Sequence, residues 1–251
     1  MGPKGRCGDY FGCVPERSGA RDPARRSSFG GNPQLWNDGS ERFYAGQEAV
    51  DDVAFIGAML DELSTRIAVD PQRVFVTGFS NGASMRFRVG AELPRRIAAI
   101  APVAGALWIE PPALNPPVPM LYITGTADPL NLIEGGAPRL ASGGSDAVRA
   151  KPKPPVAESI AKWARALGCP ASPQSDSSAE GVRTRIYCDR AQAEVRYIAV
   201  EDLGHTWAGG KSLLPERMVG KTSGRIDATG VIWEFFQKHA RSAAARSGAS
   251  R

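Results

Sequence analysis

The chain has 251 residues, of which 42% are hydrophobic and 23% are charged, a composition that argues against wholesale disorder and against a membrane-embedded chain. Its formal net charge of +5 arises from excess Lys and Arg in residues 1–30 and 241–251, so neither a basic folded face nor a nucleic-acid partner is predicted. The longest apolar stretch, 97–109, is too short to cross a bilayer, so no membrane partner is predicted.

The chain divides into three regions. Residues 1–31 are rich in Gly, Pro, Arg and Ser without a periodic pattern, and they predict an irregular or disordered segment. Residues 32–240 alternate between strand-like and helix-like runs, with a long Gly-, Pro- and Ser-rich connection at 134–155, and residues 241–251 predict a disordered tail. The alternation predicts an α/β fold, a mostly parallel sheet with helices on both faces. Strands are predicted at 73–77, 97–103, 118–124, 184–188 and 194–200, and helices at 50–67, 83–92, 156–167 and 227–240.

The first motif with chemical content is the pentapeptide at 78–82, which reads Gly-Phe-Ser-Asn-Gly and fits G-x-S-x-G. Small residues around the serine are needed because bulkier ones would clash in a tight strand-to-helix turn. A strand-like run precedes the motif and a helix follows it, which is the setting that such a nucleophile elbow requires. Ser80 is therefore the candidate nucleophile, and a tight turn without chemistry is the alternative.

A serine nucleophile needs a base, and the chain contains two histidines. His205 follows the strand predicted at 194–200, so it would lie over the carboxyl edge of a parallel sheet. His239 lies near the end of the last predicted helix, where a histidine usually complements the helix dipole. His205 is therefore the predicted base.

The base needs an orienting carboxylate. Asp128 follows the strand predicted at 118–124 and would also lie at the carboxyl edge. The chain order Ser80, Asp128, His205 is that of α/β-hydrolases. The rival acids are less well placed: one is too close in sequence to His205 and the other lies within a strand-like run. These rivals are Asp202 and Asp189.

The four cysteines contain no C-x-x-C pair, and no metal or cofactor motif is recognisable elsewhere, so neither a metal nor a cofactor is predicted. Cys169 and Cys188 could form a disulfide worth about 3 kcal/mol in an oxidising compartment. Two free buried thiols remain the alternative at this stage.

Several segments together resemble those of one enzyme family. They are 32–40 (NPQLWNDGS), 50–53 (VDDV), 70–83 (DPQRVFVTGFSNGA), 97–105 (IAAIAPVAG), the turn at 125–128 and 204–209 (GHTWAG). These segments resemble the polyhydroxybutyrate depolymerase and feruloyl esterase family of secreted serine esterases, over about residues 32–240.

The resemblance implies an α/β-hydrolase fold and hydrolysis of carboxylic esters, with Ser80 as nucleophile, His205 as base and Asp128 as its partner. The ester substrate would be a polyhydroxyalkanoate, a feruloyl ester or a short-chain acyl ester. The backbone N–H of Asn81 would serve as one oxyanion donor.

The same resemblance implies that Trp36 and Trp207 line the substrate cleft and that Cys169 pairs with Cys188. It also implies an extracellular location, although no signal-peptide h-region is visible in residues 1–30.

The sequence departs from the family at its start. Similar proteins carry several strands and a His-Gly-Gly-like loop before the Trp-Asn-Asp segment, and that loop supplies a second oxyanion donor. Residues 1–31 contain no strand-like run and no histidine, so a shortened N-terminal part of the fold is expected, as from a truncated or mis-started reading frame. Two alternative functions therefore remain: an inactive remnant or binding module, and a peptidase or thioesterase using the same triad. The oligomeric state is not predicted.

Overall fold

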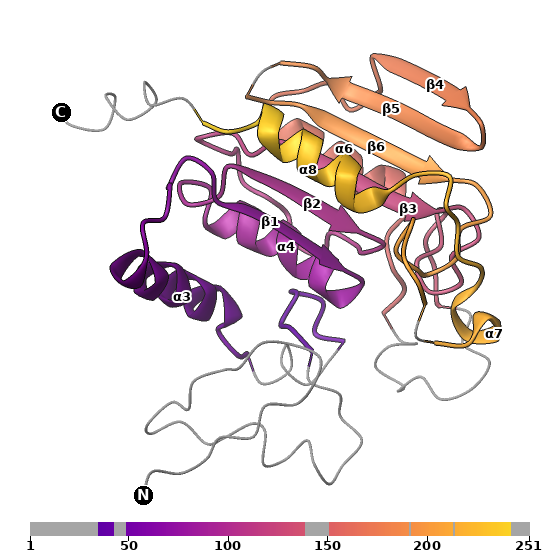
Figure 1. Ribbon diagram of the computed structural model, residues 1–251, viewed down its shortest axis with the longest axis horizontal. Coiled ribbons are helices and arrows are strands. Elements are labelled where there is room, and N and C mark those ends of the chain that lie inside the picture. The colour runs from indigo at the N-terminus through magenta and orange to yellow at the C-terminus, as the bar shows by residue number, and fades with distance from the viewer. Residues whose placement is uncertain (1–34, 43–48, 139–150, 191, 213, 242–251) are drawn as a thin grey trace, which may run out of the picture. The chain divides into compact units, whose positions relative to one another are not determined.

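One six-stranded sheet organises the part of the chain that the structure describes (Figure 1). This computed structural model describes residues 35–42, 49–138, 151–190, 192–212 and 214–241. The segment 1–31 therefore lies outside the described residues, as does the predicted tail apart from Arg241. The strands are β1 (Phe75–Phe79), β2 (Ala99–Val103), β3 (Met120–Gly125), β4 (Ser175–Ala179), β5 (Val182–Cys188) and β6 (Val195–Val200).

The sheet is mostly parallel, as the sequence predicts. The strand order is β1-β2-β3-β6-β5-β4, and β1, β2, β3 and β6 pair in parallel. The last two strands form an antiparallel hairpin at one edge, and β1 forms the other edge. Parallel neighbours bring the carboxyl ends of β1, β3 and β6 to the same edge of the sheet, where the predicted site residues follow.

Helices cover both faces of the sheet. Alternate residues along each strand point to opposite faces, so Ile100 and Met120 pack against α4 and α6, whereas Ala101 and Leu121 pack on the side of α8. This arrangement is the predicted α/β-hydrolase fold. The helices are α3 (Asp52–Arg66), α4 (Asn81–Glu92), α6 (Val156–Ala166), the short α7 (Glu216–Val219) and α8 (Ala228–Lys238).

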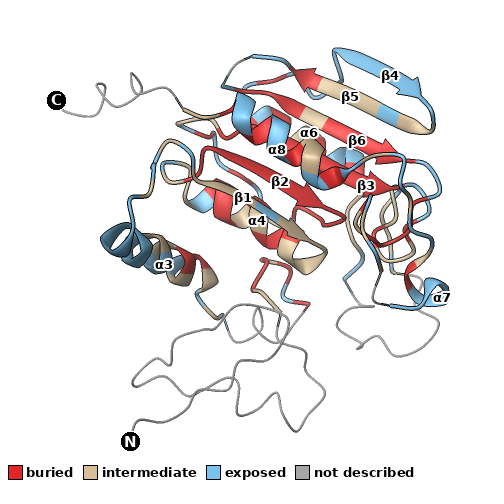
Figure 2. Cartoon of the chain, viewed as in Figure 1, coloured by how far each residue is buried: buried red, intermediate tan, exposed pale blue. Residues whose placement is uncertain are grey.

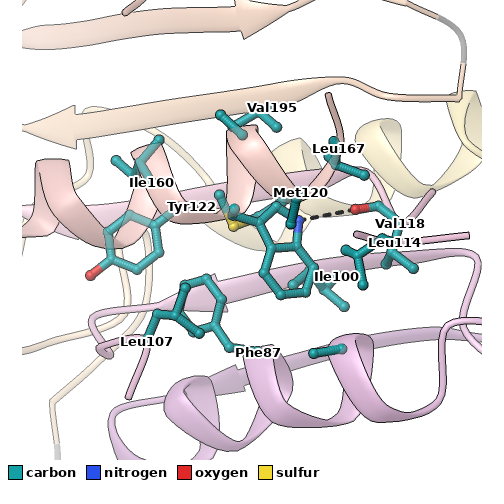
Figure 3. Close-up of a cluster of buried hydrophobic side chains, with 14 of the residues drawn as sticks. Phe87, Ile100, Leu107, Leu114, Val118, Met120, Tyr122, Ile160, Leu167 and Val195 are labelled. Atoms are coloured by element: carbon teal, nitrogen blue, oxygen red, sulfur yellow. Dashed lines mark hydrogen bonds between the residues drawn. The ribbon is translucent and has the colours of Figure 1, made fainter. Parts of the chain in front are cut away.

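The larger core cluster is built around aromatic rings (Figure 3). Phe87 of α4 lies 6.0 Å from the ring of Tyr122 and 5.7 Å from that of Trp163, measured between ring centroids. The buried indole N–H of Trp163 donates to the carbonyl oxygen of Val118 over 3.0 Å, so its one polar atom is satisfied. These contacts tie α4 and α6, which lie on one face of the sheet, to β3, the strand that leads to Asp128.

The β4–β5 hairpin departs from the sequence prediction because β4 was not expected. All five residues of β4 are exposed, and Figure 2 shows the strand in pale blue at the edge of the sheet, beside the partly buried β5. Its sequence, SDSSA, has no apolar alternation that would reveal a strand. Strand pairing defines it, with Asp176 bonded to Arg183 and Arg185 across the hairpin.

Capping residues set the start of two helices. The carboxylate of Asp51 accepts from the backbone N–H of Ala54 at the start of α3, and Asp227 accepts from Thr229 at the start of α8. Within the described residues, the longest helix falls short of the length and apolar character needed to cross a membrane.

Candidate active site

Ser80 lies in the sharp turn between β1 and α4, where its backbone adopts φ 56° and ψ −120°. A positive φ is unfavourable for a residue with a Cβ and costs on the order of 1–3 kcal/mol. Glycines make the turn possible: a Cβ on Gly78 would lie 2.6 Å from the carbonyl oxygen of Gly82, and one on Gly105 would lie 2.8 Å from that of Ser80. The strained turn therefore presents the serine at the carboxyl edge of the sheet.

Ser80, His205 and Asp128 form one continuous chain of hydrogen bonds. Nε2 of His205 lies 2.8 Å from Oγ of Ser80, and Nδ1 lies 2.8 Å from Oδ2 of Asp128. The other carboxylate oxygen of Asp128 accepts from the backbone N–H groups of Leu130 and Asn131 over 2.7 and 2.8 Å. A carboxylate that only accepts fixes the proton of the imidazole on Nδ1, so Nε2 is left to accept from the serine hydroxyl.

Close contact between two loops brings the acid to the histidine. The backbone N–H of Ala127, beside Asp128, donates to the carbonyl oxygen of Leu203 over 3.0 Å. A Cβ on Gly125 would collide with that same carbonyl oxygen, so glycine is required for the approach. The ring of Phe79 packs against the His205 imidazole, 4.7 Å between centroids, and limits its rotation.

Asn81 is the first residue of α4, so its backbone N–H belongs to the helix end whose donors have no partner within the helix. Its side chain has a separate role. Oδ1 accepts from the backbone N–H of Trp36 over 2.7 Å, and Nδ2 donates to Trp36 O and to Oδ2 of Asp38 over 3.1 and 2.9 Å. These bonds fasten the segment around Trp36 to the elbow. We assign no second oxyanion donor among the described residues.

The two tryptophans predicted to line the cleft both lie near the elbow and are partly buried. Trp36 is held by Asn81, and the guanidinium of Arg86 lies 5.6 Å from the centroid of its ring. Trp207 lies edge-on to Phe79, 6.5 Å between centroids, and its indole N–H donates to Thr229. Their role in binding stays a prediction.

The rival residues lie elsewhere in the described part of the chain. His239 is buried at the end of α8, where its Nε2 lies 2.9 Å from Oε2 of Glu194. Asp189 is exposed and pairs with Lys238, and Asp202 is exposed in the turn after β6. Asp128 is the carboxylate that the structure brings to His205.

Sequence reasoning missed the polar residues behind Asp128. The amide Nδ2 of buried Asn131 donates to the hydroxyl oxygens of Tyr122 and Thr124 over 2.9 and 3.3 Å. Its Oδ1 accepts from Nζ of Lys153 over 3.0 Å. The Asp-Pro-Leu-Asn run offered a weak signal for the turn at Asn131. Lys153 lies in a proline-rich loop, and no local pattern points to it.

Cys169, just after α6, and Cys188, at the end of β5, form a disulfide with a Cα–Cα distance of 5.8 Å. The alternative of two free thiols does not hold in the structure. The bond joins the segment that follows α6 to the end of β5.

An open cleft of about 580 Å³ lies beside Ala127, the neighbour of Asp128. It contains no side chain of Ser80, Asp128 or His205, so it is not the catalytic cleft. Among the described residues, no group of three metal-ligating side chains is found. The residues lining the cleft are Ala127, Asp202, Glu216, Arg217, Gly220 and Lys221.

Proteins similar to this chain in sequence or in structure are named as esterases. The chain is 33% identical over 196 residues, 73% of its length, to NocK of Nocardia uniformis subsp. tsuyamanensis, which is named as an esterase, and covers 56% of that protein. It is 29% identical over 170 residues to feruloyl esterase B of Piromyces equi, covering 64% of this chain and 30% of that protein. The chain therefore spans only part of both relatives.

No protein-family model matches the chain. A solved structure, acetyl xylan esterase from Aspergillus awamori, has a TM-score of 0.49 and 16% identity, covering 74% of this chain and 67% of that chain.

The mostly parallel sheet, the strained turn at Ser80 and the histidine–carboxylate pair at the same edge define the fold class of the protein, an α/β-hydrolase fold. The names of the similar proteins then point to one group of enzymes with this fold. The chain is similar to proteins named as an esterase and as a feruloyl esterase, which supports a feruloyl esterase-like family.

Proposed function

We propose that this chain hydrolyses carboxylic esters through an acyl-enzyme on Ser80. The observation that carries the proposal is the hydrogen-bond chain from Ser80 through His205 to Asp128, with 2.8 Å at each link. A hydroxyl is a weak nucleophile at its free pKa, and a neutral imidazole within hydrogen-bond distance is what activates it.

The reaction has two halves. Ser80 Oγ attacks the ester carbonyl carbon while His205 Nε2 takes the hydroxyl proton, and the imidazolium then gives that proton to the leaving alkoxide. Water next attacks the acyl-enzyme, with His205 as base, and the carboxylic acid leaves while Ser80 regains its proton. Asp128 stabilises the imidazolium in both halves.

The oxyanion needs hydrogen-bond donors, and the Asn81 backbone N–H is one at the start of α4. The partial positive charge of the helix N-terminus adds to its effect. Loss of one such donor costs about 10² to 10³ in kcat, so the presence of a second donor strongly affects the kcat of the chain.

The substrate is proposed to be a feruloyl, short-chain acyl or polyhydroxyalkanoate-type ester. The names of the relatives include feruloyl esterase, which supports an aromatic acyl group. Trp36 and Trp207, both partly buried near the elbow, supply ring faces on which such a group could stack. Neither tryptophan distinguishes a polymer from a small ester.

An extracellular location is also proposed, supported by the disulfide between Cys169 and Cys188, because such bonds persist in oxidising compartments. A thiol count on denatured, unreduced protein from its native source tests this proposal. Free thiols at both positions would contradict it.

The experiment for the activity compares hydrolysis of p-nitrophenyl acetate and of methyl ferulate by the chain, by Ser80→Ala and by Ser64→Ala. Ser64 is an exposed serine of α3 and serves as the matched control. We expect Ser80→Ala to lose at least about 10³ in kcat while Ser64→Ala keeps the full rate. A burst of p-nitrophenol equal to the enzyme concentration would support the acyl-enzyme.

Three outcomes would overturn the proposal. Turnover that survives Ser80→Ala would place the chemistry elsewhere. Equal, negligible rates in protein that circular dichroism shows to be folded would favour an inactive remnant or binding module. Faster cleavage of matched anilide or thioester substrates than of esters would instead favour a peptidase or thioesterase.

A further inference from the structure

The carboxylate of Asp128 is backed by a buried hydrogen-bond network that the triad does not itself require. Asn131 is its centre. The backbone N–H of Asn131 donates to Oδ1 of Asp128, and its side-chain amide donates to Tyr122 and Thr124 on β3. Its Oδ1 accepts from Nζ of Lys153. Asn131 is therefore fixed on three sides, and Lys153 brings a positive charge to the network.

Backbone hydrogen bonds hold the main chain at Lys153 in place. Lys153 and Gly136 exchange two backbone hydrogen bonds, of 2.9 and 3.0 Å, in an isolated antiparallel bridge. The bridge closes the base of the connection after β3, on the same stretch of chain as Asn131. The lysine side chain is thus directed from a fixed backbone towards the acid loop.

The charges around Lys153 come from two segments. Burial lowers the pKa of Lys153 to about 8, while Asp128 and Asp38 act to raise that pKa and Arg42 acts to lower it. Electrostatic interaction is reciprocal, so the ammonium charge of Lys153 acts in turn on Asp128 and on His205, which is hydrogen-bonded to Asp128. Nearby, Lys151 pairs with Glu41 at the exposed surface, 3.8 Å apart.

We propose that Lys153 is a positioning residue for the catalytic pair: it holds Asn131 behind Asp128, and its positive charge opposes protonation of His205. A base must be neutral before it can take the serine proton. A buried carboxylate alone favours the protonated imidazole, and a cation behind that carboxylate offsets part of the effect. This inference rests on the proposed function of the triad.

The test is the pH profile of kcat/KM between pH 5 and 9.5, since its acid limb reports protonation of the free enzyme's essential base. Lys153→Gln removes the charge and keeps a donor for Asn131. We expect the midpoint of its acid limb to move to higher pH by roughly 0.5 to 1 unit, a three- to tenfold loss at pH 5 to 6.

The positive charge of Lys153 itself depends on pH. Lys153 is charged below its pKa of about 8 and loses its charge above it, so the wild-type and Lys153→Gln profiles should converge above that pH. Lys153→Arg keeps the charge and should keep the wild-type midpoint. Lys151→Met, the matched control, removes a charge two residues away at the surface and should leave the profile unchanged.

The outcomes separate the possibilities. A Lys153→Gln profile lowered equally at every pH, or one that coincides with wild type, would overturn the electrostatic role. If Lys153→Gln does not fold, the comparison is made with Lys153→Met, for which the same shift is expected. If Ser80→Ala retains activity, the proposed function fails first. If Ser80→Ala is inactive while the acid limb ignores Lys153, only the present inference fails.

Discussion

Both histidines of the described chain are paired with a buried carboxylate, and the two pairs lie at opposite ends of β6. His205 follows the strand and bonds to Asp128 over 2.8 Å, whereas Glu194 precedes it and bonds to His239 over 2.9 Å. The two distances are nearly the same, although the carboxylate meets Nδ1 of His205 and Nε2 of His239. What differs is the third partner, and that difference separates a candidate for chemistry from a structural anchor.

At the carboxyl end of β6 the second nitrogen of His205 lies against a serine hydroxyl on a strained turn. At the other end Glu194 is surrounded by cations: Nζ of Lys238 donates to Oε2 over 2.6 Å, and a guanidinium nitrogen of Arg196 lies 2.6 Å from Oε1. Cations around the carboxylate hold α8 to the start of β6. The comparison teaches that two histidine–carboxylate pairs of similar length differ in their surroundings: a serine hydroxyl lies against His205, whereas cations surround Glu194.

The largest expected contrast is between the two histidines in activity. His205→Ala removes the base, and we expect kcat to fall by about 10⁴ or more with little change in the free energy of unfolding. His239→Ala removes a buried partner of Glu194 and should lower the free energy of unfolding by a few kcal/mol, with kcat within about threefold of wild type. Steady-state kinetics and urea unfolding measure both. A His239→Ala variant that folds normally yet loses 10⁴ in kcat would break the comparison.

The sequence was sufficient to predict that Ser80, Asp128 and His205 come together, because each of them lies in or after a recognisable strand or motif. The G-x-S-x-G motif indicates Ser80. Asp128 and His205 follow apolar strands of a parallel sheet, so chain order and topology place them at the same edge as Ser80. The supporting residues gave no such signal. Lys153 lies in a proline-rich loop and meets Asn131 across 22 residues of sequence, a contact that only tertiary packing creates. The polar strand β4 was missed because pairing with β5, not its own pattern, makes it a strand.

The next contrast compares two carboxylates that share Lys238. Glu194 has a fully buried side chain, whereas the side chain of Asp189 is 61% exposed. Glu194→Gln removes the buried negative charge that Lys238, His239 and Arg196 share, and it should lower the free energy of unfolding by about 3 kcal/mol. Asp189→Asn, the matched control, should cost no more than about 0.5 kcal/mol. Equal losses in urea unfolding would show that Glu194 is no anchor.

The smallest expected effect is the pH dependence of that anchor. Burial raises the pKa of Glu194, but His239, Lys238 and Arg196 outweigh it and lower the pKa from 4.5 to about 2. A carboxyl group whose pKa is depressed by folding stabilises the protein above its unfolded pKa, and this contribution is lost as pH falls through the folded pKa. The difference in unfolding free energy between wild type and Glu194→Gln should therefore be constant above pH 5 and shrink by about 2 kcal/mol towards pH 3. Below pH 2, where Glu194 is protonated in the folded protein as well, Glu and Gln are both neutral groups, so the two proteins should unfold alike. A difference that stays constant down to pH 2 would mean that Glu194 stabilises the fold by packing and not by its charge.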